Sequence, residues 1–463
     1  MTNIIKNQGS FKDPAGNIYD YNGRIIRKVT KFGKLRYEFI KNSGILQSSI
    51  DNGYLVDTKE ISDLKNERFF SDAEHLLEHK VIPYISYPYE WNFYQLQAAA
   101  IHHLDFQIFL LKKRAILIDA NSFNIQFIGS KPIFIDVLSI DKYKEGSFWF
   151  GHKQFCELFL NPLLLRSIKG INFNNWYRGN VNGITTEELN SLLSFYEKLS
   201  YNIFFHVTML SKLNKKTVTD PKKTLNKLKK VKSFSKSSYL ALLLQLRNWI
   251  RKLKIKKIKS TWDNYSEDNS YDQKSINSKL NIVKNFIKKT KPNLLADLGC
   301  NDGKFSLASL DNGCKHVIGF DFDINSTEKA YLNFKDKSFL PLYFDAANPS
   351  SNIGWNENER FGFNKRANFD ALIALAFEHH LSIAKNIPLK EVVMWLVNIA
   401  PKGLIEFVPK NDPTIQQMLS LKGDIFQDYT EDNFRKYILE HNKIVNEIYL
   451  EGCKRIIFEY ESS

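Results

Sequence analysis

The most informative stretch of the chain reads Asp297-Leu298-Gly299-Cys300-Asn301-Asp302-Gly303-Lys304-Phe305-Ser306, directly after the apolar run Leu294 to Ala296. A strand that passes through a glycine turn into a helix is typical of a doubly wound α/β fold, in which the turn approaches a nucleotide-like ligand. A second apolar run, Val317 to Phe320, ends in Asp321, twenty-four residues after Asp297. Since an acid at that place binds ribose hydroxyls, the two segments predict a ligand that contains adenosine.

The charge of the glycine turn distinguishes between the ligands of this kind. A dinucleotide site uses Gly-x-Gly-x-x-Gly and holds a pyrophosphate, whereas here the pattern is Gly299-x-Asn301-x-Gly303-x-x-Ser306, without the third glycine. Carboxylates at Asp297 and Asp302 would repel a pyrophosphate. They suit a ligand with an ammonium group and no phosphate, and S-adenosylmethionine is such a ligand.

On these residues the stretch resembles motif I of the class I S-adenosylmethionine-dependent methyltransferases, and Asp321 resembles their ribose-binding acid. The resemblance implies S-adenosyl-L-methionine as cofactor and an acid after the third strand, Asp345, beside the adenine amino group. The candidate cofactor-binding residues are Asp297, Gly299, Asn301, Gly303, Asp321, Asp345 and Ala374. The alternative is a Rossmann-like domain that binds no cofactor.

The rest of the C-terminal half fits an α/β fold of this class. Apolar residues at helical spacing predict a helix over Ser278 to Lys289. The further strands that we expect are Pro341 to Asp345, Phe369 to Leu375, Gly403 to Val408, Ile444 to Leu450 and Arg455 to Tyr460. The run from Phe369 is continuously apolar, as in a strand buried on both faces. The last two strands are close enough in sequence to pair antiparallel.

The net charge of +15 is concentrated in one window of the 463 residues. Residues 211–260 hold seventeen lysines and arginines against one acid, Asp220. A solvated lysine-rich linker is the favoured interpretation, and an anionic membrane or nucleic acid contact is the alternative. Proteins that bind single-stranded nucleic acid need aromatic residues between the basic ones, and this window has few of them. The leucines of residues 239–258 predict an amphipathic helix that packs on a neighbouring domain.

The four cysteines, Cys156, Cys300, Cys314 and Cys453, show no C-x-x-C spacing and no metal pattern. Free thiols are typical of a reducing compartment. The first ten residues are polar and lack the apolar core of a signal peptide, and no apolar run approaches the ~20 residues of a membrane span. We therefore expect a cytoplasmic protein without a metal centre.

Residues 1–210 carry their own pattern, which predicts an α+β domain. Residues 17–29 and 34–40 are expected to form strands joined by a turn at Phe32-Gly33, and a helix is expected over residues 92–113. The run from Ile116 to Phe127, a turn at Gly129-Ser130 and the run from Pro132 to Asp136 predict a hairpin. Its ends would present Asp119, Asn124 and Asp136.

The spacing Asp119-x-x-x-x-Asn124, a hairpin and then Asp136 resembles the catalytic and metal-binding loops of protein-kinase-like and aminoglycoside-phosphotransferase-like folds. The resemblance implies that Asp119 orients a hydroxyl nucleophile and that Asn124 and Asp136 hold magnesium. Leu117 and Ile118 replace the usual residues before the first Asp, and Val137 replaces the usual glycine after the last. Capping of a turn by these side chains is the alternative.

Several stretches together resemble one family of bacterial class I methyltransferases, whose members include nodulation proteins and proteins from surface-polysaccharide genes. The carrying stretches are Tyr87 to Trp91, Asp119 to Asp136, Gln154 to Cys156, Thr261 to Tyr265, Asp297 to Ser306, Asn348-Pro349, Gly354-Trp355, Glu359-Arg360, His379 to Leu381, Ile405 to Lys410 and Asp428 to Thr430. They cover most of the chain outside the lysine-rich window. Fold and cofactor do not fix a methyl acceptor.

The candidate catalytic residues follow the fourth strand, at the sheet edge where α/β folds bind ligands. His379 or His380 is a candidate general base for a hydroxyl, with Glu378 in reserve. Adjacent helical residues point about 100° apart, so at most one histidine should face the ligand. The alternative is a helix start with one buried histidine. A long polar segment, residues 348–368, is expected near the same edge. Within it, Arg360 would bind an anionic acceptor or pair with Glu359.

We therefore predict three parts: residues 1–210, an α+β domain of uncertain role; residues 211–260, the basic linker with its helix; and residues 261–463, the methyltransferase domain. The expected reaction is O-methylation of a small-molecule or glycan acceptor. The alternatives are a nucleic-acid methyltransferase, which the scarcity of aromatic residues in the basic window disfavours, a bifunctional protein whose N-terminal domain binds nucleotide and magnesium, and a non-catalytic scaffold.

Overall fold

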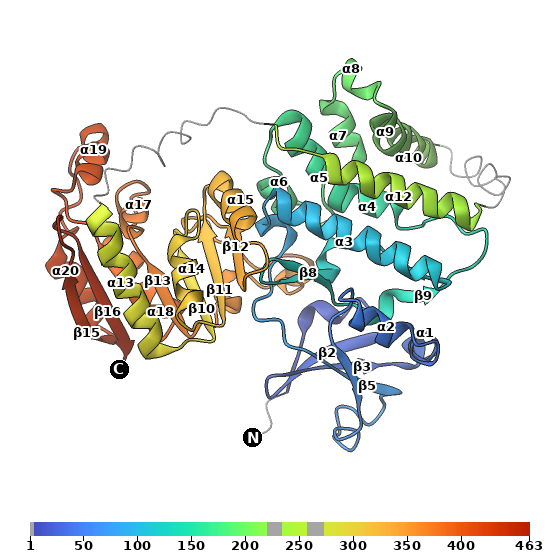
Figure 1. Ribbon diagram of the computed structural model, residues 1–463, viewed down its shortest axis with the longest axis horizontal. Coiled ribbons are helices and arrows are strands. Elements are labelled where there is room, and N and C mark those ends of the chain that lie inside the picture. Colours follow the sequence, from blue (N-terminus) through green and yellow to red (C-terminus); the bar gives the residue numbers. More distant parts are fainter. Residues whose placement is uncertain (1–3, 220–233, 257–272) are drawn as a thin grey trace. The chain divides into compact units, whose positions relative to one another are not determined.

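The computed structural model describes residues 4–219, 234–256 and 273–463 of the chain, so parts of the lysine-rich window lie outside the described residues. The chain forms two compact units (Figure 1). The first comprises Met1–Phe127, Lys131–Ile258 and Gly354–Arg360, and the second comprises Ile128–Ser130, Lys259–Ile353 and Phe361–Ser463. Among the described helices, none combines the length and the apolar character needed to cross a membrane.

The second unit is built on a seven-stranded sheet with the order β12-β11-β10-β13-β14-β16-β15. Its strands are β10 (Leu294–Leu298), β11 (His316–Asp321), β12 (Phe339–Tyr343), β13 (Ala371–Ala374), β14 (Lys402–Phe407), β15 (Asn442–Tyr449) and β16 (Ile456–Ser462). The first five run parallel, and β16 and β15 close the sheet as an antiparallel pair. All seven strands expected from the sequence are confirmed, and so is the α/β class of this half.

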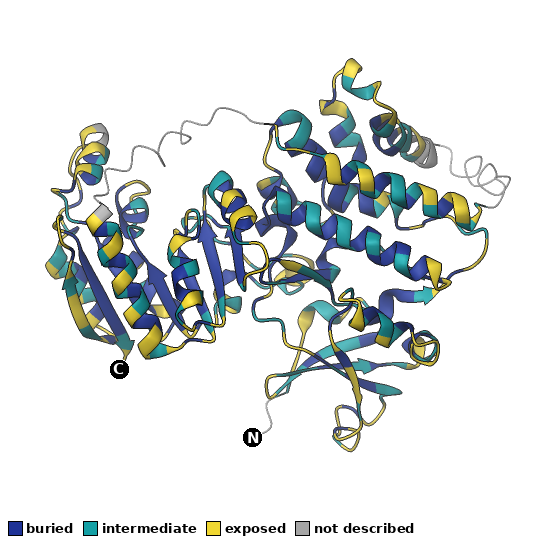
Figure 2. Cartoon of the chain, viewed as in Figure 1, coloured by how far each residue is buried: buried dark blue, intermediate teal, exposed yellow. Residues whose placement is uncertain are grey.

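Helices flank this sheet in the second unit (Figure 1). They are α13 (Gln273–Thr290), α14 (Lys304–Asp311), α15 (Ile324–Asn333), α16 (Phe363–Arg366), α17 (Glu378–Ser382), α18 (Leu389–Ile399), α19 (Pro413–Lys422) and α20 (Glu431–Leu439). The five parallel strands are buried almost throughout, as Figure 2 shows. Burial on both faces explains why their sequences are continuously apolar instead of alternating.

The first unit begins with a five-stranded antiparallel sheet in the order β1-β2-β3-β5-β4. Its strands are β1 (Ile4–Lys6), β2 (Gly16–Tyr21), β3 (Arg24–Val29), β4 (Thr58–Ile61) and β5 (His75–His79). Two small two-stranded sheets follow, β6 (Ala115–Leu117) with β9 (Ile140–Lys142), and β7 (Ile125–Ile128) with β8 (Lys131–Phe134). The predicted hairpin at Gly129-Ser130 is therefore confirmed.

The helices of the first unit gather around the long α3 (Phe93–Lys112), which confirms the helix expected there. The others are α1 (Lys31–Asn42), α2 (Ile45–Asp51), α4 (His152–Phe155), α5 (Asn161–Leu164), α6 (Asn174–Gly179), α7 (Thr186–Leu192), α8 (Phe195–Lys198), α9 (Tyr201–Ile203), α10 (Leu210–Thr219) and α12 (Lys236–Lys252). The amphipathic α12 lies along α3 (Figure 1), where Tyr239 accepts a hydrogen bond from Gln107 and Arg247 pairs with Asp105. This helix thus forms part of the first unit.

The strand expected over residues 34–40 is wrong, because this segment belongs to α1. Thr30 caps the helix by accepting a hydrogen bond from the Phe32 backbone N–H. The buried residues Gly33, Tyr37 and Ile40 recur at intervals of four and three, which places them on one face of a helix. The turn expected at Phe32-Gly33 is therefore the first turn of that helix.

A buried ion pair joins α13 to the sheet in the second unit. The Lys279 Nζ lies 2.7 Å from the Glu406 Oε2, and both side chains are almost fully buried. Arg455 lies 3.6 Å from the other oxygen of Glu406 and pairs closely with Asp412. Each buried charge therefore has an opposite charge beside it, as burial in low dielectric requires.

Replacement of Lys279 by methionine should destabilise the second unit, because it leaves the Glu406 carboxylate buried with only the more distant Arg455. Breaking a buried pair of this kind costs about 3 kcal/mol. The matched control is Lys289→Met on the same helix, which removes an exposed partner of Glu459 and should cost less than about 1 kcal/mol. Pulse proteolysis in urea measures both, and equal losses would refute the assignment.

Candidate active site at the edge of the parallel sheet

The glycine turn between β10 and α14 lies against the next strand of the sheet. The backbone N–H groups of Gly299 and Cys300 both donate to the Phe320 carbonyl oxygen, at 2.8 and 3.2 Å. Gly303 has a left-handed φ of 86°, and a Cβ there would lie 2.7 Å from the Phe339 ring. Glycine at this position is therefore required by the backbone conformation and by packing within the fold.

Asp297, the second-last residue of β10, lies in the middle of the carboxyl edge of the sheet and is almost completely buried. The Ser306 hydroxyl, from the first turn of α14, donates a 2.5 Å hydrogen bond to its Oδ2. Burial raises the pKa of the Asp297 carboxyl to about 7, against the opposing effect of Ser306 and with a smaller contribution from the charge of Asp321. This carboxyl group is therefore poorly solvated.

Asp321 ends β11, the strand beside β10, and is also buried. Its two oxygens accept hydrogen bonds from the backbone N–H of Asn301 at 2.8 Å and from that of Asp323 at 2.9 Å. Burial raises the pKa of its carboxyl to about 6, although these backbone donors oppose the shift. The Asn301 contact ties the glycine turn to the neighbouring strand.

Asp345 and Ala374 complete the group of candidate cofactor-binding residues. Asp345 follows the end of β12, where its Oδ1 accepts from the Ala347 N–H at 3.0 Å. Ala374 is the last residue of β13 and pairs in register with Leu298 of β10. The structure therefore brings all of these residues to the carboxyl ends of four adjacent parallel strands, the edge at which such sheets bind ligands.

The chemistry of this edge fits the cofactor expected from the sequence. Among the described residues, no lysine or arginine forms an ion pair with Asp297 or Asp321. Two buried carboxylates with neutral partners would repel a pyrophosphate and can accept hydrogen bonds from an ammonium group and from ribose hydroxyls. S-adenosylmethionine offers both of these donors, and its sulfonium supplies an electrophilic methyl group.

The candidate catalytic residues lie just after β13 and differ in their surroundings. Glu378 is buried, and its Oε1 accepts from the Val408 N–H at 2.8 Å and from the Tyr429 hydroxyl at 2.9 Å. His379 is also buried, with its Nδ1 3.6 Å from the Glu378 Oε2. His380 is partly exposed, and burial together with the neighbouring His379 lowers its pKa to about 3. Only His380 has an exposed surface that a ligand can reach.

The strands of this sheet, numbered along the second unit, lie in the order third, second, first, fourth, fifth, seventh, sixth, and the first two carry acids at their carboxyl ends. This arrangement defines a class I S-adenosylmethionine-dependent methyltransferase. No protein-family model matches the chain. The chain belongs to the family of the nodulation protein NoeA of Rhizobium meliloti (strain 1021), to which it is 41% identical over 458 residues, 98% of this chain and 96% of that protein. The family expected from the sequence is confirmed.

Solved structures similar to this chain cover less than half of it. One is the N-methyltransferase NodS of Bradyrhizobium japonicum WM9 in complex with S-adenosyl-L-homocysteine, with 12% identity, coverage of 43% of this chain and 92% of that chain, and a TM-score of 0.32. Another is the magnesium protoporphyrin IX methyltransferase of Synechocystis PCC 6803, with 15% identity, coverage of 48% and 95%, and a TM-score of 0.31. The class assignment rests on the sheet order and the strand-end acids instead.

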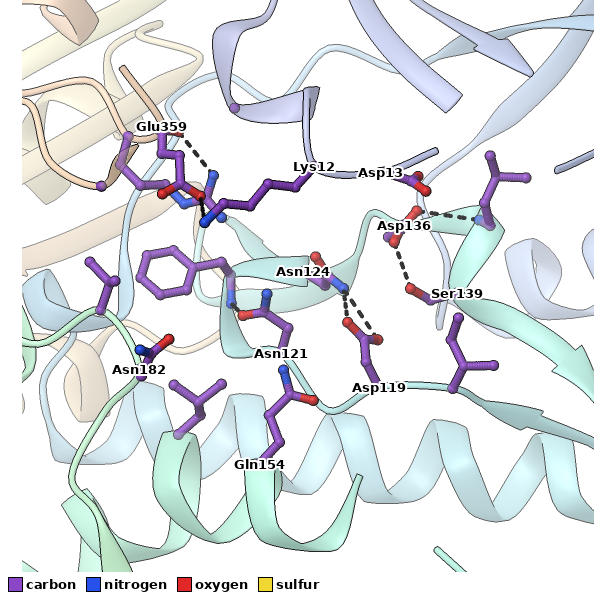
Figure 3. Close-up of a pocket in the computed structure, with 18 of the residues that line it drawn as sticks. Lys12, Asp13, Asp119, Asn121, Asn124, Asp136, Ser139, Gln154, Asn182 and Glu359 are labelled. Carbon is purple, nitrogen blue, oxygen red and sulfur yellow. Dashed lines mark hydrogen bonds and ion pairs between the residues drawn. The ribbon is translucent and has the colours of Figure 1, made fainter. Parts of the chain in front are cut away.

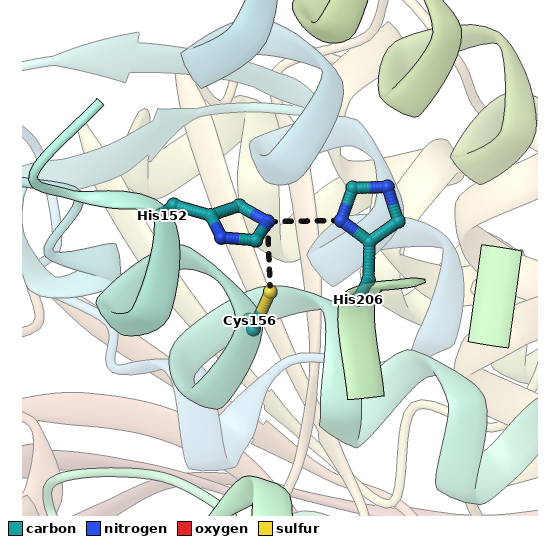
Figure 4. A group of neighbouring side chains, drawn as sticks. All are labelled: His152, Cys156 and His206. Carbon is teal, nitrogen blue, oxygen red and sulfur yellow. Dashed lines mark hydrogen bonds between the residues drawn. The ribbon is translucent and has the colours of Figure 1, made fainter. Parts of the chain in front are cut away.

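A second group of potential ligand side chains lies in the first unit, where His152, Cys156 and His206 place donor atoms within 4.8 Å of one another (Figure 4). Burial lowers the pKa of His152 to about 4 and of His206 to about 3, so both imidazoles are neutral. Their facing nitrogens are 2.9 Å apart, whereas two nitrogens on one tetrahedral zinc would be about 3.3 Å apart. The group is a neutral hydrogen-bonded cluster, and the absence of a metal centre stays a prediction.

Without ligand, the second unit should lose stability as the pH rises from about 4 to about 7. The folded-state pKa of Asp297 lies above its ordinary 3.8, so the folded state binds the proton more tightly, and ionisation in the buried site costs at most about 4 kcal/mol. Asp297→Asn should flatten this dependence, because the neutral amide does not ionise. Hydrogen exchange in peptides across β10 and β11, corrected for intrinsic rates, measures it, and parallel profiles would contradict the proposed cause.

Proposed function

We propose that this chain transfers a methyl group from S-adenosylmethionine to the hydroxyl oxygen of a small-molecule or glycan acceptor. The observation that carries the proposal is the pair of buried carboxylates, Asp297 and Asp321, without a cationic partner among the described residues at the ligand-binding edge. The sequence after β13 is Ala376-Phe377-Glu378-His379. It lacks the Asn-Pro-Pro-Tyr-like signature of amide and amine methylators, which favours oxygen as the accepting atom.

In this proposal the residues at the different strand ends bind different parts of the cofactor. Asp297 accepts from the ammonium group of the cofactor, directly or through the Ser306 hydroxyl beside it, and Asp321 accepts from the ribose hydroxyls. Asp345 accepts from the adenine amino group, while the small side chain of Ala374 leaves the end of β13 open. Charged hydrogen bonds contribute more than neutral ones, so the two buried acids should dominate the affinity.

His380 is the proposed contact with the acceptor. Its depressed pKa keeps the imidazole neutral at pH 7, so it accepts a hydrogen bond from the acceptor hydroxyl and orients the oxygen, but it is a weak base. The oxygen attacks the methyl carbon, the bond from this carbon to sulfur breaks to leave S-adenosylhomocysteine, and the hydroxyl proton passes to solvent. Methyl transfer by direct displacement depends mostly on the positioning of the attacking atom. Glu378 and His379 are proposed to act through the backbone that they hold, because both are buried and Glu378 fixes the Val408 N–H.

We also propose a cytoplasmic location, because all four cysteines are free thiols and free thiols are typical of reducing compartments. The nucleic-acid alternative depends on the lysine-rich window, and residues 220–233 and 257–272 lie outside the described part of the chain. In the described part, the basic α12 packs its apolar face on α3. A small or glycan acceptor therefore remains the favoured substrate class.

Calorimetric titration with S-adenosylmethionine and S-adenosylhomocysteine should give micromolar affinity for the wild-type chain. Asp297→Ala and Asp321→Ala should each weaken binding by at least about 1.5 kcal/mol, because each removes a charged hydrogen bond to the ligand. Asp370→Ala is the matched control, because Asp370 binds backbone N–H groups before β10, at the opposite end of that strand. Unchanged affinity in both acid variants would refute the binding site.

His380→Asn should reduce methyl incorporation at least tenfold and leave S-adenosylmethionine affinity unchanged, because the residue orients the acceptor and does not hold the cofactor. Radiolabelled S-adenosylmethionine with the low-molecular-mass fraction of a bacterial extract provides the assay. A product stable to mild alkali is the expected methyl ether of a hydroxyl group. His441→Asn, at an exposed histidine of the same unit, is the control, and equal activity of both variants would refute the role of His380.

A further inference from the structure

The first unit contains a cavity of about 420 Å³ that the methyltransferase reaction does not explain (Figure 3). Its wall includes Lys12 from the loop after β1, Asp119 and Asn124 from the turn before β7, and Asp136 from the end of β8. A volume of this size is within the range of small-molecule sites. The cavity therefore collects the polar residues that the sequence places before and after the hairpin.

One wall of the cavity is rich in oxygen atoms. Asp136 accepts hydrogen bonds from the Ser139 hydroxyl at 2.5 Å and from the Leu138 N–H at 3.3 Å. The Asn124 amide nitrogen is 3.3 and 3.5 Å from the two oxygens of Asp119, so these contacts are long and weak. Figure 3 shows the Asp119, Asn124 and Asp136 side chains close together. Carboxylate and amide oxygens are the ligands that hard divalent cations prefer.

The charges on this wall are not balanced. Arg27 lies 2.8 Å from Asp136 and 3.7 Å from Asp13, so one guanidinium serves two carboxylates. Asp119 has no ion pair with a described lysine or arginine. Arg27 itself is 7% exposed, and its Nε has no hydrogen-bond partner among the described residues. A bound cation would neutralise the excess of negative charge on this wall.

The other side of the cavity carries cationic side chains. Lys12 forms a 2.6 Å ion pair with Glu359, and its side chain is 61% exposed. Arg360 stacks on the Phe123 ring with its guanidinium carbon 4.7 Å from the ring centroid. Arg36 instead lies near the acidic wall, where it donates to the carbonyl oxygen of Leu138 at 2.7 Å, and the Leu138 N–H donates to Asp136. A ligand with several negative charges would therefore contact cations on one side. On its other side, a metal ion would lie between the ligand and the carboxylates.

From this division of charge we propose that the cavity binds a magnesium ion at Asp119, Asn124 and Asp136 together with the phosphate groups of a nucleotide. The ion bridges the carboxylates and the phosphates, which would otherwise repel each other. Lys12 exchanges its exposed contact with Glu359 for the phosphates, and the Phe123 side of the cavity receives the nucleoside. This site is independent of the methyl-transfer proposal.

Full-length protein should bind one Mn²⁺, used in place of magnesium because electron paramagnetic resonance detects it, and saturating ATP should tighten this binding at least tenfold. Asp119→Asn and Asp136→Asn should each weaken Mn²⁺ binding at least tenfold. Asp72→Asn is the control, because Asp72 is an exposed acid of the same unit that does not line the cavity. Calorimetry in the presence of magnesium should show ATP binding at least tenfold tighter than tripolyphosphate or adenosine.

Three results would overturn the proposal: no Mn²⁺ binding at millimolar concentration, Mn²⁺ binding that both Asp variants retain, or equal affinity for ATP and tripolyphosphate. Asp136→Asn also removes a partner of Arg27 and can disturb the fold, so Asp119→Asn, which breaks no ion pair in the described chain, is decisive. Unchanged S-adenosylmethionine affinity of Asp119→Asn shows that the second unit is intact, and it separates this test from that of methyl transfer.

Discussion

The hydrogen bond from the Asn301 N–H to the Asp321 carboxylate is the contact on which the methyltransferase site depends. It fixes the glycine turn after β10 against the end of β11, and it holds one acid while the turn presents the other. Because Asn301 has a positive φ of 48°, the backbone reaches this position only through a left-handed conformation. This conformation costs conformational free energy, and the resulting turn lies beside two carboxylates at the sheet edge.

Burial of those carboxylates is unfavourable for the fold by itself. The rest of the second unit supplies the stability that permits it, since its five parallel strands are buried on both faces and the buried charges of Lys279, Glu406, Asp412 and Arg455 are paired. The contrast between Glu406, which has Lys279 beside it, and Asp297, which has only a serine hydroxyl, is informative. Unpaired buried acids at a ligand-binding edge are a sign of function, whereas paired ones serve the structure.

Much of the second unit could be predicted from the sequence, because its parallel strands are mainly apolar runs and the acids stand at the strand ends. The first unit was harder to predict. Residues 34–40 contain Tyr37 and Ile40, which suit a strand as well as a helix, and the Thr30 cap that decides for α1 lies outside that window. Sequence spacing also gave no sign that His206 would meet Cys156, because contacts between distant helices depend on tertiary packing.

The candidate site shows a similar limit. The order Glu378-His379-His380 presents three ionisable side chains, and only the structure separates the two that are buried from the one that is partly exposed. The buried position of Glu378 depends on hydrogen bonds from the Val408 N–H and the Tyr429 hydroxyl, and both residues are thirty or more positions away in the sequence. Residues 354–360, expected beside the sheet edge, instead belong to the first unit.

The two units use buried acids in different ways, and the difference lies in the cations around them. Asp297 and Asp321 have no cationic partner in the described chain, so a ligand with a single positive charge and several hydroxyl donors satisfies them. Asp119 and Asp136 share their cavity with the cationic side chains of Lys12, Arg36 and Arg360. An ammonium group alone would be repelled by those cations, whereas in the proposed complex the divalent metal contacts the acids and its phosphates contact the cations. In these two proposals the same residue type binds ligands of opposite charge, because the neighbouring side chains differ.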